Sequence, residues 1–372
     1  MAPRTMSVDV IRISTKGPGD VSGLVQLIEA GHIDPASILA ILGKTEGNGG
    51  VNDFTREYAT SALSVALAPC LALTPRGVEE RIAFVMSGGT EGVLSPHITV
   101  FTRKMSDDNG DRQKLGGKRL SIGIAQTRDF RPEEIGRAVQ VSETANAVRS
   151  AMADAGIDDP ADVHFVQIKC PLLTSDRIED AHGRGQKTVT YSAYGSMGYS
   201  RGASALGIAV ALGEIKDEIG DNHVLKNYDL FSSVASTSSG IELMHNVVIV
   251  MGNSHHATSA FTIGHAVMRD AIDYVAVIEA LKSVGLEPQS GAGAPDRLVN
   301  IFAKAEASPD GTVRGLRHTM LEDTDISATR HARAAVGGLI SGLAGTCAVY
   351  VSGGAEHQGP PGGGPIAVIA RA

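Results

Sequence analysis

Three Ser-Gly pairs follow short stretches without charged residues, and their residue types could bind carbonyl groups. They are Ser87-Gly88, Ser239-Gly240 and Ser352-Gly353. A serine at the end of a strand exposes its hydroxyl group, and the following glycine lets backbone N–H groups come close to a ligand. Such N–H groups can hold a carbonyl oxygen, or the oxyanion that forms from it during acyl transfer. The pairs therefore indicate a site for a carbonyl compound.

Three lysines end apolar runs upstream of these serines, namely Lys44, Lys169 and Lys304. A lysine can take the proton of a serine only if its pKa lies well below the value in solution. Burial and the convergence of several cations would both lower that pKa, because each disfavours the ammonium form. Ser–Lys pairs are a known variant of the nucleophile–base arrangement. The lysines are thus candidate bases.

Three arginines lie between the lysines and the serines, and each begins a helical pattern. They are Arg56, Arg201 and Arg333. A guanidinium group is always charged and can bind carbonyl or anionic oxygens with two N–H groups. Any one lysine or arginine at the end of an element is usually solvated, but the order Lys, Arg, Ser-Gly occurs three times.

The elements around these residues also recur. Strands are predicted at 36–42, 81–86, 97–104, 162–169, 246–251, 297–304 and 365–372, and helices at 55–73, 200–215 and 333–345. Segments 121–130 and 261–270 each open with a further strand. We predict an α+β fold of three homologous α/β repeats around a pseudo-threefold axis, with the active site at the centre. The predicted repeats are unit A (1–106), unit B (117–253) and unit C (259–372), joined by linkers at 107–116 and 254–258.

Composition narrows the class of protein. The chain has 372 residues and a net charge of −8, with 4% aromatic residues and no Trp. A mildly acidic chain of this kind lacks the basic clusters of nucleic-acid and membrane-surface binders. Three cysteines without CxxC spacing are typical of reduced thiols in the cytoplasm. We expect a cytoplasmic protein that binds neither nucleic acid nor membrane.

Several long motifs carry a resemblance to a known family. The stretches "LGKTEGNGGVNDFTREYA", "MSGGTEGVLSPHITVF", "FVQIKCPLL", "SSGIELMHN" and "VSGGAEHQGPPGGGP" resemble the ring-opening amidohydrolases, whose members open cyanuric acid or barbituric acid. The resemblance covers essentially the whole chain. It implies a homotetramer that hydrolyses cyanuric acid to carboxybiuret, which loses CO2 to give biuret.

The resemblance also implies roles for single residues. Lys169 matches the catalytic lysine and Ser239 the nucleophile, while the three arginines, the three Ser-Gly pairs, Lys44 and Lys304 match the substrate-binding set. No catalytic cofactor is implied, but a structural Mg²⁺ or Ca²⁺ is. Its ligands, mostly carbonyl oxygens as hard cations prefer, would be Glu306, Ala355, Gln358, Gly359, Pro360 and Gly363.

Some assignments stay open on the sequence alone. Arg330 could replace Arg333 as the third clamp, since both would share a helical face. The stretch "STSSG" offers Ser236 and Ser238 besides Ser239, and spacing does not say which Ser–Lys pair is chemically active. Cys170 should face the core, because neighbouring strand residues point to opposite faces. Barbituric acid is an alternative substrate, and a non-catalytic binder of cyclic imides is the alternative class.

Overall fold

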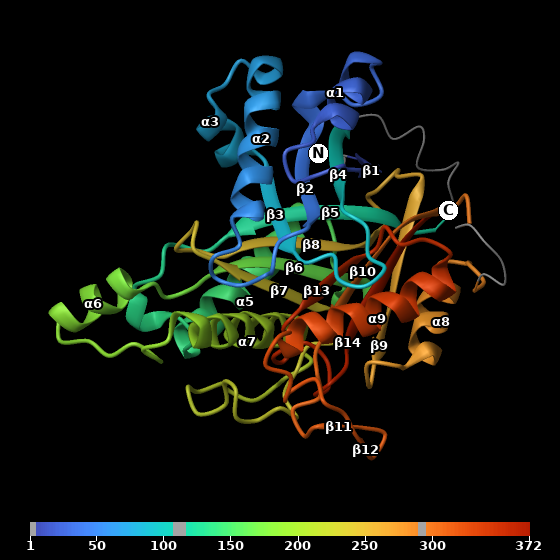
Figure 1. Ribbon diagram of the computed structural model, residues 1–372. Helices are drawn as coiled ribbons and strands as arrows, with labels where there is room; N and C mark the ends of the chain where they lie inside the picture. The colour runs from blue at the N-terminus through green and yellow to red at the C-terminus, as the bar shows by residue number, and fades with distance from the viewer. Residues whose placement is uncertain (1–4, 107–116, 289–294) are drawn as a thin grey trace.

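Three four-stranded sheets with one strand order form the framework of the computed structural model, which describes residues 5–106, 117–288 and 295–372 (Figure 1). The predicted linker 107–116 lies outside the described residues. The strands of unit A are β1 (Thr5–Ser14), β2 (Ile38–Thr45), β3 (Ala83–Gly88) and β4 (His97–Ser106). Those of unit B are β5 (Arg119–Gln126), β6 (Val163–Pro171), β7 (Ala235–Gly240) and β8 (Val247–Ser254). Those of unit C are β9 (Phe261–Met268), β10 (Leu298–Ala305), β13 (Tyr350–Gly353) and β14 (Gly364–Arg371).

The order within each sheet is first, fourth, second, third strand, as in β1-β4-β2-β3 and β5-β8-β6-β7. The third sheet has the same order, β9-β14-β10-β13. In every sheet the second and third strands are parallel, and the fourth runs antiparallel between the first and second. The carboxyl ends of each parallel pair, which carry a lysine and a serine, therefore lie side by side.

Helices cover the outer face of each sheet. Unit A has α1 (Ser22–Glu29), α2 (Phe54–Leu71) and α3 (Pro75–Arg81), and unit B has α5 (Ala138–Asp154), α6 (Ser175–Gly183) and α7 (Ala193–Leu212). Unit C has α8 (Tyr274–Ser283) and α9 (Ala328–Ala344). Short 3₁₀ turns η1 (Pro35–Ser37), η2 (Pro132–Glu134) and η3 (Pro160–Asp162) precede later elements, and β11 (Thr312–Val313) pairs with β12 (Leu316–Arg317).

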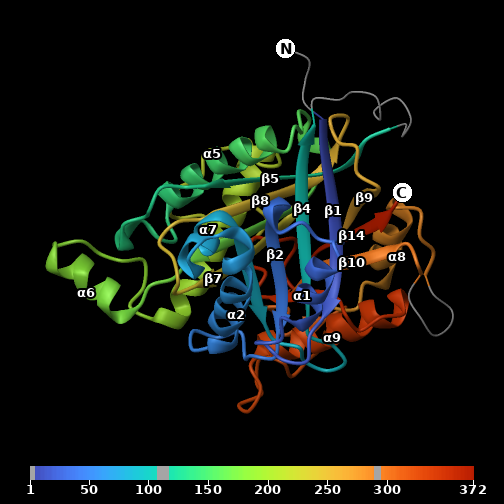
Figure 2. The same cartoon turned by 90° about the horizontal axis from the view of Figure 1, so that it is seen from above.

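The inner faces of the three sheets meet in one shared core. Phe101, Phe165, Phe302 and Tyr350 lie in this core, and Phe302 touches the other three, with ring centroids 6.3, 5.4 and 5.5 Å apart. Seen from above, α5, α6, α8 and α9 lie toward the periphery of the molecule, with the three sets of strands between them (Figure 2). The outer faces pack against their own helices in separate clusters. Each sheet is thus buried on both faces.

Two helices begin earlier than the sequence pattern predicts. The third residue of α2 is Arg56, close to the expected start, because Asp53 caps the helix by accepting a hydrogen bond from Thr55 N–H. In unit B, Ser192 caps the helix by accepting from Gly195 N–H, so α7 starts eight residues before Arg201. In unit C, α9 starts at Ala328, ahead of Arg333. The predictions that these two arginines begin their helices were wrong.

The connection at 254–258 is bonded to the start of the chain. Met6 N–H donates to His256 O at 2.9 Å, and Thr258 N–H donates to Met6 O at 2.8 Å. The predicted linker between units B and C therefore also ties both of them to β1.

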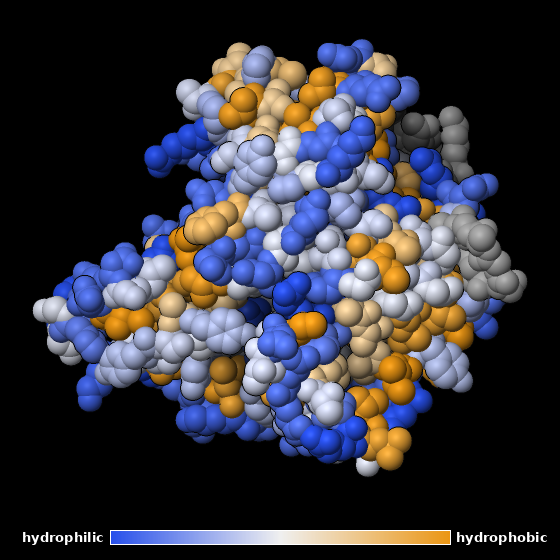
Figure 3. Space-filling view, in the orientation of Figure 1, coloured by the Kyte–Doolittle hydropathy of each residue, from blue (hydrophilic) through white to orange (hydrophobic). Residues whose placement is uncertain are grey.

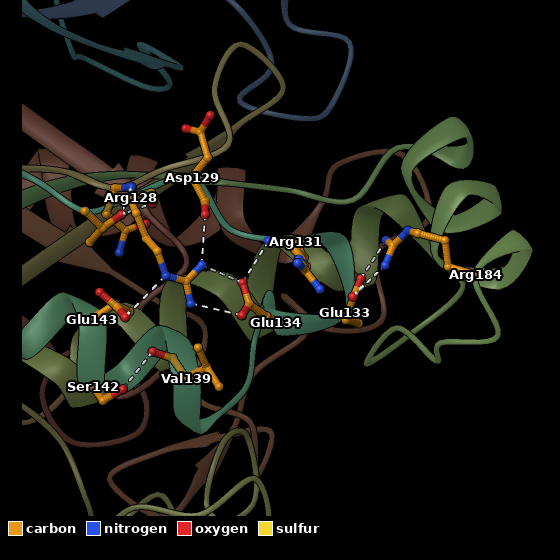
Figure 4. Close-up of polar contacts among 11 residues, drawn as sticks. Arg128, Asp129, Arg131, Glu133, Glu134, Val139, Ser142, Glu143 and Arg184 are labelled. Carbon is orange, nitrogen blue, oxygen red and sulfur yellow. Dashed lines mark hydrogen bonds and ion pairs between the residues drawn. The ribbon is translucent and has the colours of Figure 1, made fainter.

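Within unit B, α6 lies on a peripheral arm, and ion pairs connect this arm to η2 and η2 to the segment after β5 (Figure 4). Arg184 binds both carboxylate oxygens of Glu133 at 2.7 and 2.8 Å, and Arg128 binds those of Glu134 at 2.8 and 2.9 Å. These two-point contacts fix η2 relative to the segment after β5 and to the end of α6.

Among the described residues, no single helix is long and apolar enough to cross a membrane. Only α2 and α3 taken together reach that length and composition, and they are bent by 95° relative to each other.

Candidate active site

The strand register pairs each lysine with one serine. Lys44 lies opposite Ser87 in the β2–β3 pair, and Lys304 lies opposite Ser352 in the β10–β13 pair. In the β6–β7 pair, Lys169 lies opposite Ser238, whereas Ser239 lies opposite Cys170. Because side chains alternate along a strand, Ser238 shares a face with Lys169 and Ser239 points to the other face. The register therefore moves the candidate nucleophile of unit B from Ser239 to Ser238.

The three lysines extend from the shared core toward the carboxyl ends of the strands. Their neighbours two residues upstream include Leu42 and Phe302, which belong to that core. The lysines are buried, with exposures of 1% for Lys44, 1% for Lys169 and none for Lys304. An apolar strand face thus carries the amino groups of Lys44 and Lys304 up to a serine hydroxyl.

Lys44 and Lys304 have closely similar surroundings. Lys44 Nζ lies 3.1 Å from Ser87 Oγ and donates to the carbonyl oxygens of Gly88 and Val351, at 3.4 and 2.7 Å. Lys304 Nζ lies 3.2 Å from Ser352 Oγ, with Gly353 O at 3.1 Å and Thr237 O at 3.0 Å.

Two carbonyls and one hydroxyl around an amino group suit both of its protonation states. An ammonium group donates to all three oxygens. A neutral amine donates to the two carbonyls and accepts the serine O–H. In each case one carbonyl comes from another unit, so the dyads are built across the junctions between units.

Lys169 has different surroundings. Its Nζ forms an ion pair with Glu242 Oε1 at 2.7 Å, and within the described part of the chain no carbonyl or hydroxyl oxygen bonds to it. Ser238 Oγ lies 3.3 Å from Ser352 Oγ. The dyad of unit B is therefore held by a carboxylate where the other two are held by carbonyls.

Burial changes the acid–base properties of these groups. It holds the pKa of Lys44 well below the usual lysine value, with a further contribution from Arg333. Burial and Arg201 lower the pKa of Lys304 to about 7. Burial also lowers the pKa of Lys169, although Glu242 opposes the change. The predicted tuning of buried lysines by desolvation and nearby cations is present in all three dyads.

Three glutamates complete the repeated pattern, and the sequence reasoning missed them. Glu91, Glu242 and Glu356 each stand four residues after Ser87, Ser238 and Ser352, a spacing that could have revealed them.

Two of these glutamates hold arginines of another unit by two-point ion pairs. Arg333 Nε and Nη2 donate to the oxygens of Glu91 at 2.7 and 2.6 Å. Arg201 donates in the same way to Glu356, at 2.8 and 2.6 Å. Arg56 instead donates to Ser239 O at 3.1 Å and Gly50 O at 2.7 Å.

The arginines and serines line one small chamber. Its lining is Gly49, Arg56, Met86, Ser87, Gly88, Met197, Arg201, Ser238, Ser239, Arg333, Ser352 and Gly353. Eight of the predicted substrate-site residues are therefore together in this lining, whereas Gly240 and the three lysines are not part of it.

The two open points on neighbouring residues now have structural answers. Arg333 is buried and lines the chamber, whereas the side chain of Arg330 is 42% exposed and is not part of the lining. Arg333 is thus the arginine in the chamber. Cys170 is buried in the outer core of unit B, as predicted.

Glu306 is the one carboxylate among the predicted cation ligands, and it is half-buried. Burial and the charge of Glu356 raise the pKa of Glu306 to about 7, and the backbone N–H groups of Gly362 and Ala355 bond to its carboxylate. The side-chain amide of Gln358 is already used, because its Oε1 accepts from Thr237 N–H and its Nε2 donates to Gly354 O. Its backbone carbonyl oxygen is therefore the atom that could bind a metal. A half-buried carboxylate is a ligand type that hard cations prefer.

Among the described residues, no three His, Cys, Asp or Glu side chains cluster as a metal site. The set around Glu306 contains only one of these side chains.

Comparisons with known proteins agree with this arrangement. A family model described as "amidohydrolase ring-opening protein" matches residues 9–371. The chain is 74% identical over 368 residues to the cyanuric acid amidohydrolase of Bradyrhizobium diazoefficiens, covering 99% of both chains. It is 59% identical over 366 residues to that of Pseudomonas sp. strain ADP, covering 98% of this chain and 99% of the other.

Two solved structures are also similar. A cyanuric acid hydrolase, described as an evolutionary innovation by structural concatenation, superposes with a TM-score of 0.93 at 58% identity, over 99% of this chain and 100% of the other. The cyanuric acid hydrolase from A. caulinodans gives a TM-score of 0.89 at 49% identity, over 98% and 99%. These relatives are enzymes, which removes the non-catalytic binder as an alternative. The chain is a hydrolase and belongs to the family of ring-opening amidohydrolases.

Proposed function

We propose that the protein hydrolyses cyanuric acid by opening its ring. The observation that carries the proposal is the chamber in which three arginines and three serines from three units converge. Cyanuric acid is a flat ring with three equivalent carbonyl groups, so three equivalent sets of donors match it. The names of the relatives support the same substrate.

In the proposed reaction Ser238 is the nucleophile and Lys169 the base. The oxygen of Ser238 bonds to a ring carbonyl carbon while its proton passes to the amine of Lys169, and the C=O electron pair moves onto the carbonyl oxygen. Backbone N–H groups at the strand ends and an arginine hold that oxyanion. When the oxyanion collapses, the C–N bond breaks and the nitrogen takes the proton from Lys169.

Water completes the cycle. It attacks the acyl carbon on Ser238 while Lys169 takes one of its protons. The bond between that carbon and the serine oxygen then breaks, and the serine oxygen takes the proton from Lys169. The product is carboxybiuret, which loses CO2 to give biuret. The other two carbonyls would be held by the rest of the chamber, namely Ser87-Gly88, Ser352-Gly353, Gly240 and the arginines Arg56, Arg201 and Arg333. Lys44 and Lys304 would orient Ser87 and Ser352.

The chain order supports a finer description of the fold. The shared strand order suggests that units A, B and C are repeats about a pseudo-threefold axis through the chamber, with the boundaries given above. We also propose a homotetramer, a cytoplasmic location, and a structural divalent cation held by Glu306 and carbonyls of Ala355, Gln358, Gly359, Pro360 and Gly363. When bound, the cation would neutralise the charge of the half-buried Glu306.

The test is an assay of purified protein on cyanuric acid and, in parallel, on barbituric acid. Loss of cyanuric acid absorbance with formation of biuret is the expected result. A higher kcat/KM on barbituric acid would contradict the substrate assignment, and no turnover of either compound would contradict the proposed reaction.

A further inference from the structure

Glu242 departs from the pattern that Glu91 and Glu356 follow. Those two bind an arginine of another unit through both oxygens, Arg333 of unit C to Glu91 of unit A and Arg201 of unit B to Glu356 of unit C. The pattern leaves Arg56 of unit A for Glu242 of unit B. Glu242 is bonded to Lys169 instead, at 2.7 Å.

Arg56 is nevertheless close enough to act on Glu242. The positive charges of Lys169 and Arg56 together outweigh burial and lower the pKa of Glu242 to about 2. Arg56 itself donates hydrogen bonds to two backbone carbonyl oxygens, those of Ser239 and Gly50. One carboxylate therefore faces two cations and holds only one of them.

The position of Glu242 gives it room to move. Its side chain is 46% exposed, against 9% for Glu91 and 16% for Glu356. It lines a groove of ≈ 1190 Å³ between α2–α3 and the strand ends of unit B. Figure 3 shows a notch on this face, between the part of the molecule built on α2 and α3 and the arm that carries α6.

The backbone of unit B explains why Glu242 takes this position. Gly89 and Gly354, two residues after their serines, have φ of 107° and 74°, and a Cβ on either would meet an arginine. Gly240 holds the same place after Ser238, but it is not among the described glycines with positive φ. A Cβ there would lie 2.0 Å from Glu242 Oε2, so the glycine lets the carboxylate fold back toward Lys169.

We infer that Glu242 is a positioning residue with two partners, holding Lys169 as an ammonium ion in one position and releasing it as an amine when it moves to Arg56. The inference rests on the proposed function, in which Lys169 takes the proton of Ser238. With Glu242 on Arg56, the proton of Lys169 leaves to water in the groove. Among the described residues no carbonyl oxygen accepts a hydrogen bond from Lys169, so its protonation depends on this one carboxylate.

The other charged groups nearby do not replace Glu242. Lys169 faces Arg56 on α2, which disfavours its ammonium form. The neighbouring thiol of Cys170 points to the opposite face of β6, and burial raises its pKa. Glu242 faces Lys169, Arg56 and, from α6, Arg177. Glu242 is thus the carboxylate that sets the charge of Lys169.

The first test compares pH profiles of kcat/KM for the wild type, Glu242→Gln and the matched control Glu91→Gln. An opposite charge within about 4–6 Å shifts a pKa by about 1–3 units, and partial exposure puts Glu242 at the lower end. We expect the acidic limb of Glu242→Gln to move to lower pH by about one unit, with the limb of Glu91→Gln unmoved and its KM raised. Glu242→Asp should restore the limb toward its wild-type position.

An unmoved limb in Glu242→Gln overturns the inference, and so does an equal shift in Glu91→Gln. A loss of kcat at every pH without a shift of the limb would indicate a merely structural role and also overturns it.

A second test needs no activity. With lysine labelled at the 13Cε position, the NMR signal of Lys169, assigned by a Lys169→Arg variant, should titrate at lower pH in Glu242→Gln. It should do so in Gly240→Ala as well, where the added Cβ displaces the carboxylate without removing its charge. Unchanged titration in both variants overturns the inference. If the wild type opens neither ring while both variants shift the titration, the proposed function fails but the ion pair stands.

Discussion

Ser238 and Ser239 are adjacent in the chain but occupy opposite faces of β7, so they form a matched pair for locating the nucleophile. Removing the attacking hydroxyl abolishes acyl transfer, whereas removing a neighbour that only contacts the site does not. We expect Ser238→Ala to lower kcat by at least about 10³-fold and Ser239→Ala by less than about tenfold. Steady-state kinetics on cyanuric acid checks this, and the reverse ranking would return the nucleophile to Ser239.

The buried lysines make a prediction about stability. Unfolded, Lys304 stays protonated up to about pH 10.4, but in the folded protein its pKa is lowered to about 7. Between these values the unfolded chain binds more protons, so the free energy of unfolding rises with pH from about 7 to about 10. Lys304→Met should flatten this rise.

Urea unfolding at several pH values measures the rise. The exposed Lys216→Met is the control and should keep the wild-type slope. An unchanged slope in Lys304→Met would mean that Lys304 stays charged in the fold.

At the scale of residues, sequence alone identified the types and order of the groups but not all of their neighbours. Lysine, arginine and serine were visible because each ends or begins an apolar run. The choice between Ser238 and Ser239 depended on register, which a strand of small polar residues such as "ASTSSG" does not reveal. Glu242 was missed because its role depends on a contact with Lys169, far away in the chain.

The turn before α2 shows how one element positions a site residue. Asp53 is buried, accepts from Thr55 N–H at 3.1 Å and also from Gly49 N–H at 2.8 Å. It therefore fixes both the helix start and the Gly-rich loop to which Arg56 is bonded.

We expect Asp53→Ala to lower the free energy of unfolding by about 1–2 kcal/mol, as the loss of a helix cap does. It should also raise KM several-fold more than it lowers kcat, because Arg56 would lose its orientation. Thermal unfolding and kinetics test both effects, with Asp34→Ala, which removes the cap of η1 away from the chamber, as the control. An equal rise in KM for both variants would contradict the link between the cap and Arg56.

At the scale of elements, the sequence predicted most of the site-bearing strands and helices, because apolar runs bounded by glycine are strong signals. The starts of α7 and α9 were misplaced because the small and polar residues before Arg201 and Arg333 show no clear helical pattern. In α7 the cap is Ser192, which lies well before Arg201 in the chain. The opening strand β1 was not predicted, although it pairs with β4 along ten residues.

The whole molecule depends on a core that no single unit owns. Phe302 of unit C touches Phe101 of unit A, Phe165 of unit B and Tyr350 of its own unit. The chamber lies at the strand ends above this core, so the packing of three sheets sets the spacing of the three dyads. Sequence repeats predicted that the units would converge, but which side chains fill the centre follows only from the sheet faces.

Replacing Phe302 tests this coupling. Phe302→Ala should lower the free energy of unfolding by about 3–5 kcal/mol, and it should reduce kcat because Lys304 stands two residues further along β10. Phe130→Ala, in a small cluster of unit B, removes a similar side chain away from the shared core and should leave kcat nearly unchanged. Because all three units pack on Phe302, calorimetry of Phe302→Ala should still show one transition, shifted as a whole. A separate early transition for unit C would mean that the units are stable independently and that the shared core does not align the dyads.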